Sequence, residues 1–283
     1  IYCFIFLFFI ADLTKKELFF NVTFWALIIT LGVQLILFIK LGLNYDSGRY
    51  MIMFQHPNQL GFWGLIVILI FISINQNIIL KSPFLFYLGI LIASFFVIAS
   101  ISQAAIIVLV LLLLIYLFST FRKSPIIFIL IFSIISFFTY SYLEQTILDD
   151  NQLTKVLISR FDSDLLNEND NDNNLEARNY NRIWENPEYL ILGAGESGLG
   201  RFGNDTNEIH STFGSILFSY GFIGLILFVS SLLKVTLYPF RINSIIFLVF
   251  LIFTVTHNVL RWPFFWALPY LMFCIKKADH VRN

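Results

Sequence analysis

Long apolar runs lie on both sides of one polar stretch, and this arrangement restricts the chain to very few folds. A helix needs roughly 20 apolar residues to cross the hydrocarbon core of a bilayer. Only helices and closed barrels satisfy their backbone hydrogen bonds in lipid, and these runs lack the alternation of barrel strands. Together with a mean hydropathy of +0.80, the runs predict an all-α, polytopic integral membrane protein.

The apolar runs predict about nine transmembrane helices. They are Ile1–Ala11, Leu18–Leu41, Leu60–Ile79, Phe84–Ala99, Ile101–Phe118, Pro125–Leu143, His210–Leu233, Ser244–Val259 and Phe264–Ile275. We expect N-terminal helices over 1–143, one large loop over 144–209 and C-terminal helices over 210–283. Because the chain starts inside an apolar run without Met, we expect a fragment that lacks N-terminal helices.

Charge is concentrated in the polar stretch Glu144–Ile209, which holds 14 of the 18 acids and five of the 18 basic residues. Its excess of acids argues against nucleic acid or anionic lipid as its ligand. Elsewhere, ten basic residues fall on one set of alternate connections and three on the other. The positive-inside rule makes the first set cytoplasmic. The large loop is therefore predicted to face the periplasm or the cell exterior.

The connection Gly42–Gln59 places Arg49, His56 and Asn58 at the predicted outer surface. An arginine there departs from the positive-inside tendency and needs an anionic partner. That partner is an acid of the large loop, an anionic substrate or, equally well on position alone, a lipid headgroup. Pro57 followed by Asn58 is also typical of a simple helix start.

Arg178 and Arg182 are four residues apart, so a helix would place both guanidiniums on one face. Two neighbouring guanidiniums suit a pyrophosphate, which offers several oxygens in matching geometry. The alternative, favoured by the pattern alone, is a solvated helix in which Glu176, Glu185 and Glu188 pair with these arginines.

Two further motifs in the loop resemble a nucleotide site and a calcium site, but each departs from the pattern that its ligand needs. Gly193–Gly198 matches a dinucleotide fingerprint and follows a strand-like stretch, Tyr189–Leu192, but the chain then runs toward a membrane helix instead of a βαβ unit. We interpret it as a glycine-rich turn that returns the loop to the membrane. The run from Asp170 resembles the start of a calcium loop, yet Leu175 and Asn181 stand where Gly and Glu are needed.

His210 opens the next predicted helix behind Asp205–Asn207, which are good capping residues. A helix N-terminus directed outward favours anions. Gly214, Gly221 and Gly224 leave notches that would allow another helix to approach closely.

At a second outer mouth, His257 and Arg261 lie four residues apart. Ionisable residues at membrane depth are candidates for function, although a single interfacial His is more often structural.

Taken in order, these segments resemble the O-antigen polymerase and O-antigen ligase superfamily. The segments that carry the resemblance are Arg49–Asn58; Arg178 with Trp184 and Leu192–Gly195; and His210–Phe213 with Tyr220–Gly224. The superfamily often has Ser-Arg at the start of a middle helix, where this chain has Ser102-Gln103. This departure puts a third arginine contact in doubt.

The resemblance implies a membrane glycosyltransferase fold with an outward-facing active site in the bacterial inner (cell) membrane. It implies inverting, metal-independent glycosyl transfer from an undecaprenyl-pyrophosphate-linked oligosaccharide, without a cofactor. Polymerisation of repeat units for O-antigen, capsule or exopolysaccharide is our first expectation. Ligation of glycan onto lipid A–core is the alternative. A flippase or exporter is a third reading, but it would need charged residues in the middle of several spans, which are almost absent here.

The predicted chemistry assigns roles to particular residues. Arg178 and Arg49 would stabilise the leaving pyrophosphate, and His210 would act on the acceptor hydroxyl as a base or, alternatively, bind phosphate. The further binding candidates are Arg182, Asn58, His56, His257 and Arg261. Expected partners are the lipid-linked oligosaccharide and the bilayer, with a flippase and a chain-length regulator as candidate protein partners.

Overall fold

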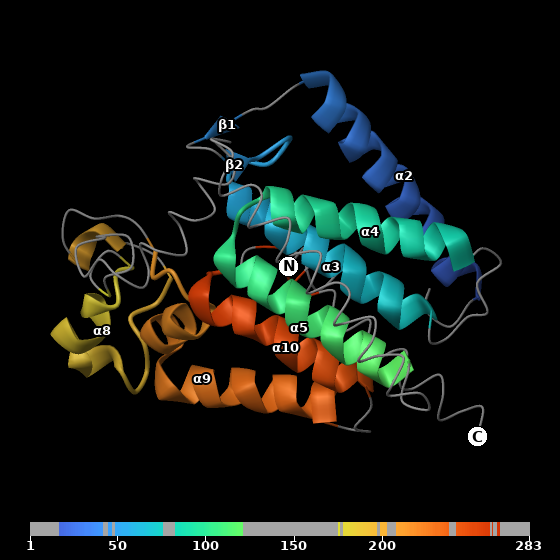
Figure 1. Cartoon of the computed structure of the whole chain (residues 1–283). Coiled ribbons are helices and arrows are strands. Elements are labelled where there is room, and N and C mark those ends of the chain that lie inside the picture. Colours follow the sequence, from blue (N-terminus) through green and yellow to red (C-terminus); the bar gives the residue numbers. More distant parts are fainter. Residues whose placement is uncertain are drawn as a thin grey trace. The chain divides into compact units, whose positions relative to one another are not determined.

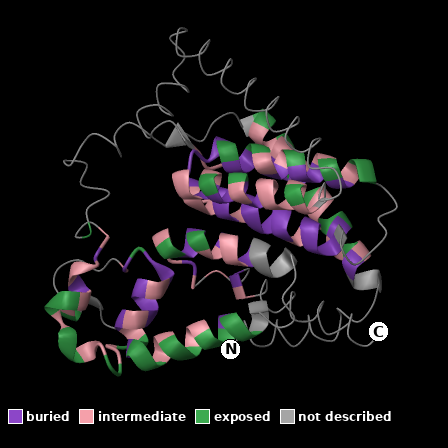
Figure 2. Cartoon of the chain, turned by 60° about the horizontal axis from the view of Figure 1, so that its bottom comes forward, coloured by how far each residue is buried: buried purple, intermediate pink, exposed green. Residues whose placement is uncertain are grey.

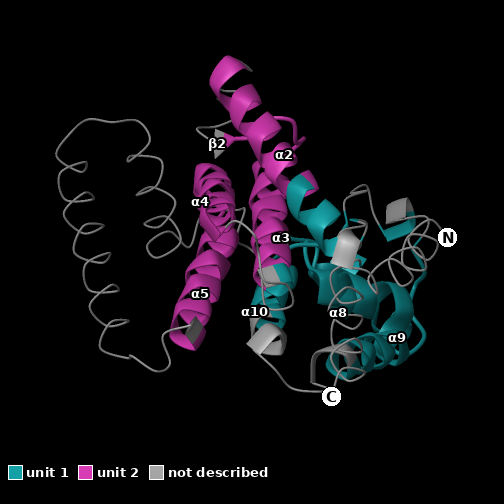
Figure 3. Ribbon diagram, turned by 90° about the vertical axis from the view of Figure 1, so that its right-hand side faces the viewer, with its two compact units in different colours: residues 1–25, 73–79, 170–283 teal, residues 26–72, 80–169 magenta. Residues whose placement is uncertain are grey.

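The computed structural model consists of α-helices, short 3₁₀ helices and one pair of two-residue strands over the residues it describes (Figure 1). These residues are 17–41, 45–46, 49–75, 83–120, 175, 178–196, 199–202, 208–237, 242–260, 262 and 265–266. The chain divides into two compact units (Figure 3). Unit 1 comprises residues 1–25, 73–79 and 170–283, and unit 2 comprises residues 26–72 and 80–169.

Most of the predicted spans that fall on described residues coincide with helices. The elements are α2 (Glu17–Leu41), β1 (Tyr45–Asp46), β2 (Arg49–Tyr50), α3 (Pro57–Asn75), α4 (Pro83–Ala99), α5 (Gln103–Thr120), α8 (Asn181–Glu185), η2 (Pro187–Tyr189), η3 (Leu199–Phe202), α9 (Thr212–Leu237) and α10 (Ile242–Thr256). Six of the nine predicted spans are therefore helical. Ile1–Ala11 and Pro125–Leu143 lie outside the described residues, as does Phe264–Ile275 apart from residues 265–266.

Three of the described helices are long and apolar enough to cross a membrane: Phe20–Lys40, Pro57–Ile74 and Thr212–Lys234. Three shorter apolar helices, Pro83–Ala99, Gln103–Ser119 and Phe247–Thr256, accompany them. The described part of the chain thus supports a helical membrane protein whose β structure is limited to the β1–β2 pair, with fewer full-length spans than the nine predicted.

Helix α4 shows why this fold suits a bilayer. One face is buried and contains Phe86, Ala93 and Phe96, while the opposite face exposes large apolar side chains. The exposed residues are Phe84, Tyr87, Leu91, Phe95 and Ile98. Figure 2 shows this two-sidedness as buried and exposed positions along the same helices. A soluble protein rarely presents such an apolar stripe to water, whereas lipid covers it without cost.

In unit 2, small residues bring helices together. A Cβ atom placed on Gly64 of α3 would lie 3.0 Å from the carbonyl oxygen of Ala93 in α4. Gly61 likewise lies against Ser100, in the short turn that joins α4 to α5. Such close approach of backbones is how membrane helices gain packing energy in the absence of a hydrophobic driving force.

In unit 1, α9 and α10 are antiparallel, since the start of α9 is bonded to the end of α10. The Thr212 backbone N–H and hydroxyl both donate to the carbonyl oxygen of His257, at 3.2 and 2.9 Å. The Val259 N–H donates in turn to the Thr212 hydroxyl at 3.1 Å. These bonds satisfy backbone groups that both helix ends would leave orphaned.

Candidate functional site at the start of helix α9

Helix α9 is broken at Gly221, and a segment of the loop is hydrogen-bonded into the break. Gly221 has φ 67° and ψ −172°, so the helical ladder stops there. The N–H groups of Ala194 and Gly195 donate to the carbonyls of Phe218 and Ser219 at 2.8 and 2.9 Å. In the other direction, the Phe222 N–H donates to the carbonyl of Leu190 at 2.7 Å. The loop therefore replaces helical bonds that the break removes.

The break lies well inside the apolar helix. Gly221 follows Thr212 by nine residues, which is about 14 Å along an α-helix. Irregular backbone at membrane depth is tolerated only where protein satisfies its polar groups, as the turn does here. The turn also exposes apolar side chains, with Ile191 65% and Leu192 76% exposed.

Glycine is required where the turn and the helix meet. A Cβ atom at Gly193 would lie 2.3 Å from the carbonyl oxygen of Ser219, and one at Gly221 would lie 2.1 Å from that of Ile191. Both glycines have positive φ, which side chains disfavour. The interpretation of Gly193–Gly198 as a glycine-rich turn is thus confirmed over its described residues, 193–196.

Two other interpretations of this region were wrong. The stretch Tyr189–Leu192 is no strand, since η2 ends at Tyr189 and a turn follows. The glycines at 221 and 224 were expected to admit another helix, but Gly221 contacts the loop backbone instead. A Cβ atom at Gly224 would lie 2.2 Å from the Cβ atom of Tyr220 on the same helix. These two glycines therefore allow the kink in α9 and the close approach of the turn.

Side chains fix the turn on both sides. The Tyr220 hydroxyl donates to a carboxylate oxygen of Glu196 at 2.6 Å. The Arg201 guanidinium donates to the carbonyl of Ala194 and lies over the ring of Phe202, 4.7 Å from its centroid. Arg201 also lies over the ring of Tyr189 at the end of η2, 5.9 Å from its centroid. This contact and the hydrogen bond to Ala194 together hold η3 against the turn.

The first turn of α9 begins two residues later than predicted. Ser211 caps the helix, because its hydroxyl oxygen accepts the N–H of Gly214 at 3.2 Å. His210 precedes the cap and is exposed. The predicted cap, Asp205–Asn207, lies outside the described residues.

Arg178 and His210 belong to adjacent chain segments. The N–H of His210 donates to the carbonyl of Arg178 at 3.2 Å, and the side-chain amide of Asn179 donates to the carbonyl of Glu208 at 3.2 Å. Asn179 has φ 60°, a left-handed conformation that Asn tolerates better than most residues. This strained turn brings the two segments together, 32 residues apart in sequence.

The expected pairing of Arg178 and Arg182 on one helix face was wrong. Helix α8 begins at Asn181, and Arg178 lies in the preceding turn, separated from the helix by the left-handed Asn179. Arg182 is only 3% exposed, so it does not lie on a solvated face as the alternative expected. The pairing of the arginines with Glu176, Glu185 and Glu188 stays a prediction. Glu185 accepts hydrogen bonds from the Asn181 amide at 3.2 and 3.3 Å.

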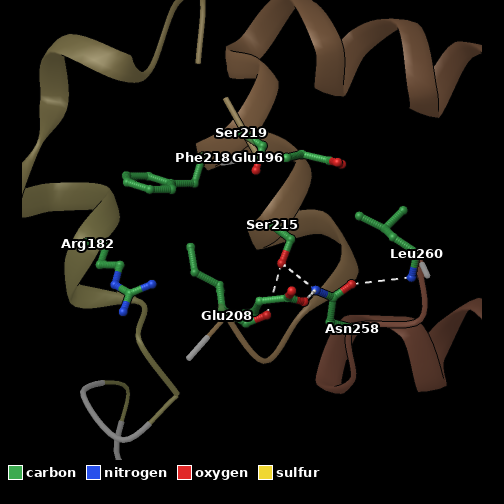
Figure 4. A pocket seen from close by; sticks show the side chains of 9 residues that line it. Arg182, Glu196, Glu208, Ser215, Phe218, Ser219, Asn258 and Leu260 are labelled. Carbon is green, nitrogen blue, oxygen red and sulfur yellow. Dashed lines mark hydrogen bonds between the residues drawn. The ribbon is translucent and has the colours of Figure 1, made fainter. Parts of the chain in front are cut away.

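A pocket opens beside these segments within unit 1 (Figure 4). Its lining comprises Arg182, Glu196, Glu208, Ile209, Ser215, Phe218, Ser219, Asn258 and Leu260. The Asn258 amide donates to the Glu208 carboxylate at 2.8 Å and to the Ser215 hydroxyl at 2.9 Å. The Ser215 hydroxyl donates to the carbonyl of Ile209 at 2.9 Å, and the Asn258 side-chain oxygen accepts the Leu260 N–H at 3.3 Å.

The candidates in unit 2 lie around the start of α3. The backbone of Arg49 is opposite that of Asp46 in the β1–β2 register. His56 caps α3, because its Nδ1 accepts the N–H of Asn58 at 3.1 Å. Helix α3 begins at Pro57, as the simple helix-start alternative expected, but His56 supplies the cap.

The last pair of candidates lies at the end of α10. The His257 ring stacks on Phe253, with 4.3 Å between centroids and 9° between planes, and its Nδ1 is 2.8 Å from the Thr256 hydroxyl. These contacts give His257 a packing role. Arg261 lies outside the described residues.

Comparison with known families decides what kind of protein this is. The sequence profile of the O-antigen ligase family matches residues 88–229, which is half of the chain. The protein belongs to the O-antigen ligase family. Members of this family are membrane proteins and glycosyltransferase-like enzymes that act on lipid-linked glycans. Comparisons with curated proteins and with solved structures find no match.

The stretch that matches the O-antigen ligase family runs from α4 into α9. It therefore includes Arg178, the Gly193–Gly195 turn, His210 and the break at Gly221. Among the described residues of this O-antigen ligase family member, no group of three or more His, Cys, Asp or Glu is placed to hold a metal ion.

Sequence reasoning missed several polar residues of the pocket, chiefly Glu208, Asn258 and Ser215. Glu208 and Asn258 lie within two residues of the named candidates His210 and His257, and Ser215 lies inside an apolar span. Glu208 is the loop acid nearest to the α9 span, and Asn258 interrupts the apolar end of α10. A polar residue at the end of a span, next to another candidate, was the available signal.

Proposed function

We propose that this protein polymerises undecaprenyl-pyrophosphate-linked oligosaccharide repeat units on the outer face of the bacterial inner membrane. The observation that carries the proposal is the contact between the Arg178 and His210 segments at the start of α9. This backbone contact joins the two chain segments that carry Arg178 and His210, whose residue types suit the reaction, inside the part of the chain that matches the family.

The chemistry of the transfer follows from these groups. An acceptor hydroxyl attacks the anomeric carbon on the face opposite to the pyrophosphate, so that a new C–O bond forms as the bond to the phosphate oxygen breaks. Negative charge grows on the leaving pyrophosphate, where Arg178 stabilises it without a metal. Arg49, which belongs to unit 2, stays a candidate for the same role. His210 takes the proton of the acceptor hydroxyl, a role suited to an exposed imidazole.

The remaining candidates have different support from their surroundings. Asn58 lies on the first turn of α3 and remains a binding candidate, together with Arg261. His56 and His257 have structural contacts as a cap and as a stacked ring. Their share in substrate binding is accordingly secondary. Arg182 lines the pocket and is a substrate-binding candidate there.

The main test replaces Arg178. Losing a charge-assisted contact used in the transition state costs about 2.7–4 kcal/mol, or roughly 10²–10³ in rate. We expect Arg178→Ala to lower polymer formation by that factor at normal expression. Arg178→Lys should rescue poorly, because a point charge does not reproduce the guanidinium fork. Full-length polymer from normally expressed Arg178→Ala would refute the assignment.

His210 needs a separate test. His210→Gln keeps a hydrogen-bonding side chain but cannot take a proton, so turnover should collapse while binding of the lipid-linked substrate persists. Near-wild-type turnover of purified His210→Gln would remove the role as base and leave phosphate binding or anchoring.

A deletion strain distinguishes polymerase from ligase. Surface glycan limited to single repeats is the result expected for a lost polymerase. Intact polymer that accumulates on the lipid carrier would instead support the alternative, transfer of glycan to lipid A–core.

The predicted topology is tested with Asn171→Cys. This cysteine should react with a membrane-impermeant thiol reagent in intact cells whose outer membrane, if they have one, has been permeabilised. Reaction only after lysis of the inner membrane would contradict the outward placement of the loop.

A further inference from the structure

The pocket of Figure 4 has the composition of a site for a neutral, hydroxyl-rich ligand. The lining includes two carboxylates, Glu196 and Glu208, and one guanidinium, Arg182, so it carries an excess of negative charge. A pyrophosphate would be repelled there. Ionised carboxylates only accept hydrogen bonds, and the groups that best supply donors without charge are hydroxyls.

The polar groups of the pocket are held in fixed orientations. The Leu260 N–H binds the side-chain oxygen of Asn258, which directs the amide nitrogen toward Glu208 and Ser215. The Ser215 hydroxyl uses its hydrogen to donate to the carbonyl of Ile209. Its oxygen therefore acts as the acceptor for the Asn258 amide. Donor and acceptor directions are therefore set before any ligand arrives, which lowers the entropy cost of binding.

Apart from Ser219, the rest of the lining is apolar. Phe218 is 2% exposed and Ile209 is 3% exposed, and both come to the pocket from segments next to His210 or the α9 break. A pocket with a few oriented polar groups on apolar walls is the usual form of a small-molecule site. A sugar ring matches it, because its hydroxyls bind the polar groups while its C–H faces pack on the apolar wall.

We propose that this pocket binds a sugar of the acceptor glycan, with a hydroxyl of that sugar donating a hydrogen bond to Glu208 and Asn258 holding the carboxylate in place. This inference rests on the proposed function and extends it, because it separates an acceptor subsite from the pyrophosphate-binding arginines. Glu208 is two residues from His210 in sequence, so an acceptor sugar bound at Glu208 lies beside the segment that carries the proposed base.

The first experiment measures binding without catalysis. The full chain, purified in detergent, is mixed with methyl glycosides of glucose, galactose and N-acetylglucosamine, and saturation-transfer NMR reports which sugars bind. We expect binding to at least one glycoside, weakened about tenfold by Glu208→Gln, because hydrogen bonds to charged groups are stronger than neutral ones. Glu188→Gln, which removes an exposed carboxylate outside the pocket, is the matched control and should bind normally. Absence of glycoside binding by the wild-type protein would overturn the inference.

The second experiment separates this inference from the proposed function. In a transfer assay, Glu208→Gln should raise KM for the acceptor about tenfold and leave KM for the lipid-linked donor unchanged. An unchanged acceptor KM, with normal transfer by the wild-type protein, would overturn the subsite and leave the proposed function intact. Glycoside binding that depends on Glu208, without transfer by the wild-type protein, would overturn the proposed function and leave the saccharide site standing. If Glu208→Gln does not elute as a folded protein, Asn258→Ser, which releases the carboxylate, takes its place with the same expectations.

Discussion

Helices α3 and α9 resemble each other in apolar composition, yet their backbones are hydrogen-bonded in different ways. Helix α3 is an unbroken helix, and 78% of its membrane-length window is buried. Helix α9 has 22% of its window buried and is interrupted at Gly221, where the Leu190–Gly195 turn is bonded to it. Both helices contain glycines at close contacts. Those of α3 allow the close approach of a neighbouring helix, whereas Gly221 of α9 allows the close approach of the loop backbone.

This difference suggests that the backbone beside the pocket is more tightly constrained than the backbone of α3. In α3, a Cβ atom added at Gly64 would first meet a side-chain methyl group of Val97, at 2.7 Å, and then the carbonyl oxygen of Ala93, at 3.0 Å. In α9, the clash would be with backbone atoms that are themselves part of a hydrogen-bonded turn. The break carries the turn to the pocket wall, since Phe218, Ser219 and Glu196 line the pocket. We therefore expect substitutions at the two helices to differ strongly in their effects.

The largest effect is expected for Gly221→Ala. A Cβ atom 2.1 Å from the carbonyl oxygen of Ile191, at positive φ, requires the turn to move. Backbone strain of about 1–3 kcal/mol and overpacking of about 1–3 kcal/mol should together lower the free energy of unfolding by roughly 2–6 kcal/mol. Thermal melting of the purified protein in detergent measures this. An unchanged melting temperature would show that the break does not depend on glycine.

A smaller effect is expected for Tyr220→Phe, which removes the bond to Glu196 at 2.6 Å but leaves the backbone alone. Hydrogen bonds to charged groups contribute about 1.5–3 kcal/mol, and the half-exposed Tyr220 should fall at the low end. Tyr87→Phe on the exposed face of α4 is the matched control and should melt like the wild type. Equal melting of both variants would mean that this bond does not hold the turn.

Gly64→Ala in α3 should cost less again. The new Cβ atom would lie 2.7 Å from a methyl group of Val97 and 3.0 Å from the carbonyl oxygen of Ala93. Overpacking of about 1–3 kcal/mol is offset by about 1 kcal/mol of helix propensity. The net loss of about 0–2 kcal/mol should stay below that of Gly221→Ala. If the order were reversed in melting experiments, helix packing would be the more demanding use of glycine.

Gly32→Ala in α2 should have the smallest effect and the opposite sign. Apart from the neighbouring residues and backbone of α2 itself, no atom lies within 4 Å of the added Cβ, and the residue is helical. Alanine should therefore raise stability by up to about 1 kcal/mol through helix propensity alone. A decrease in melting temperature would indicate that a partner covers this face of α2.

Sequence patterns predicted the features that arise from local physics. Apolar length located six helices, because the cost of unpaired backbone in lipid applies to any segment. Glycine spacing indicated the turn, since positive φ is a local property of residue type. The same reasoning failed for Arg178 and Arg182, because one residue, Asn179, adopts a left-handed conformation and ends their common periodicity.

By itself, then, the amino-acid sequence determined the membrane-helical class, the position of the main apolar helices and the family. These depend on hydropathy, length and ordered motifs, which need no knowledge of distant contacts. The tertiary structure alone decided that the loop is bonded into α9, that His210 lies beside Arg178, and that Glu208, Ser215 and Asn258 share a pocket. Those relations join segments separated by about 25 to 50 residues, and a hydrogen bond between them exists only once the chain between them has folded back.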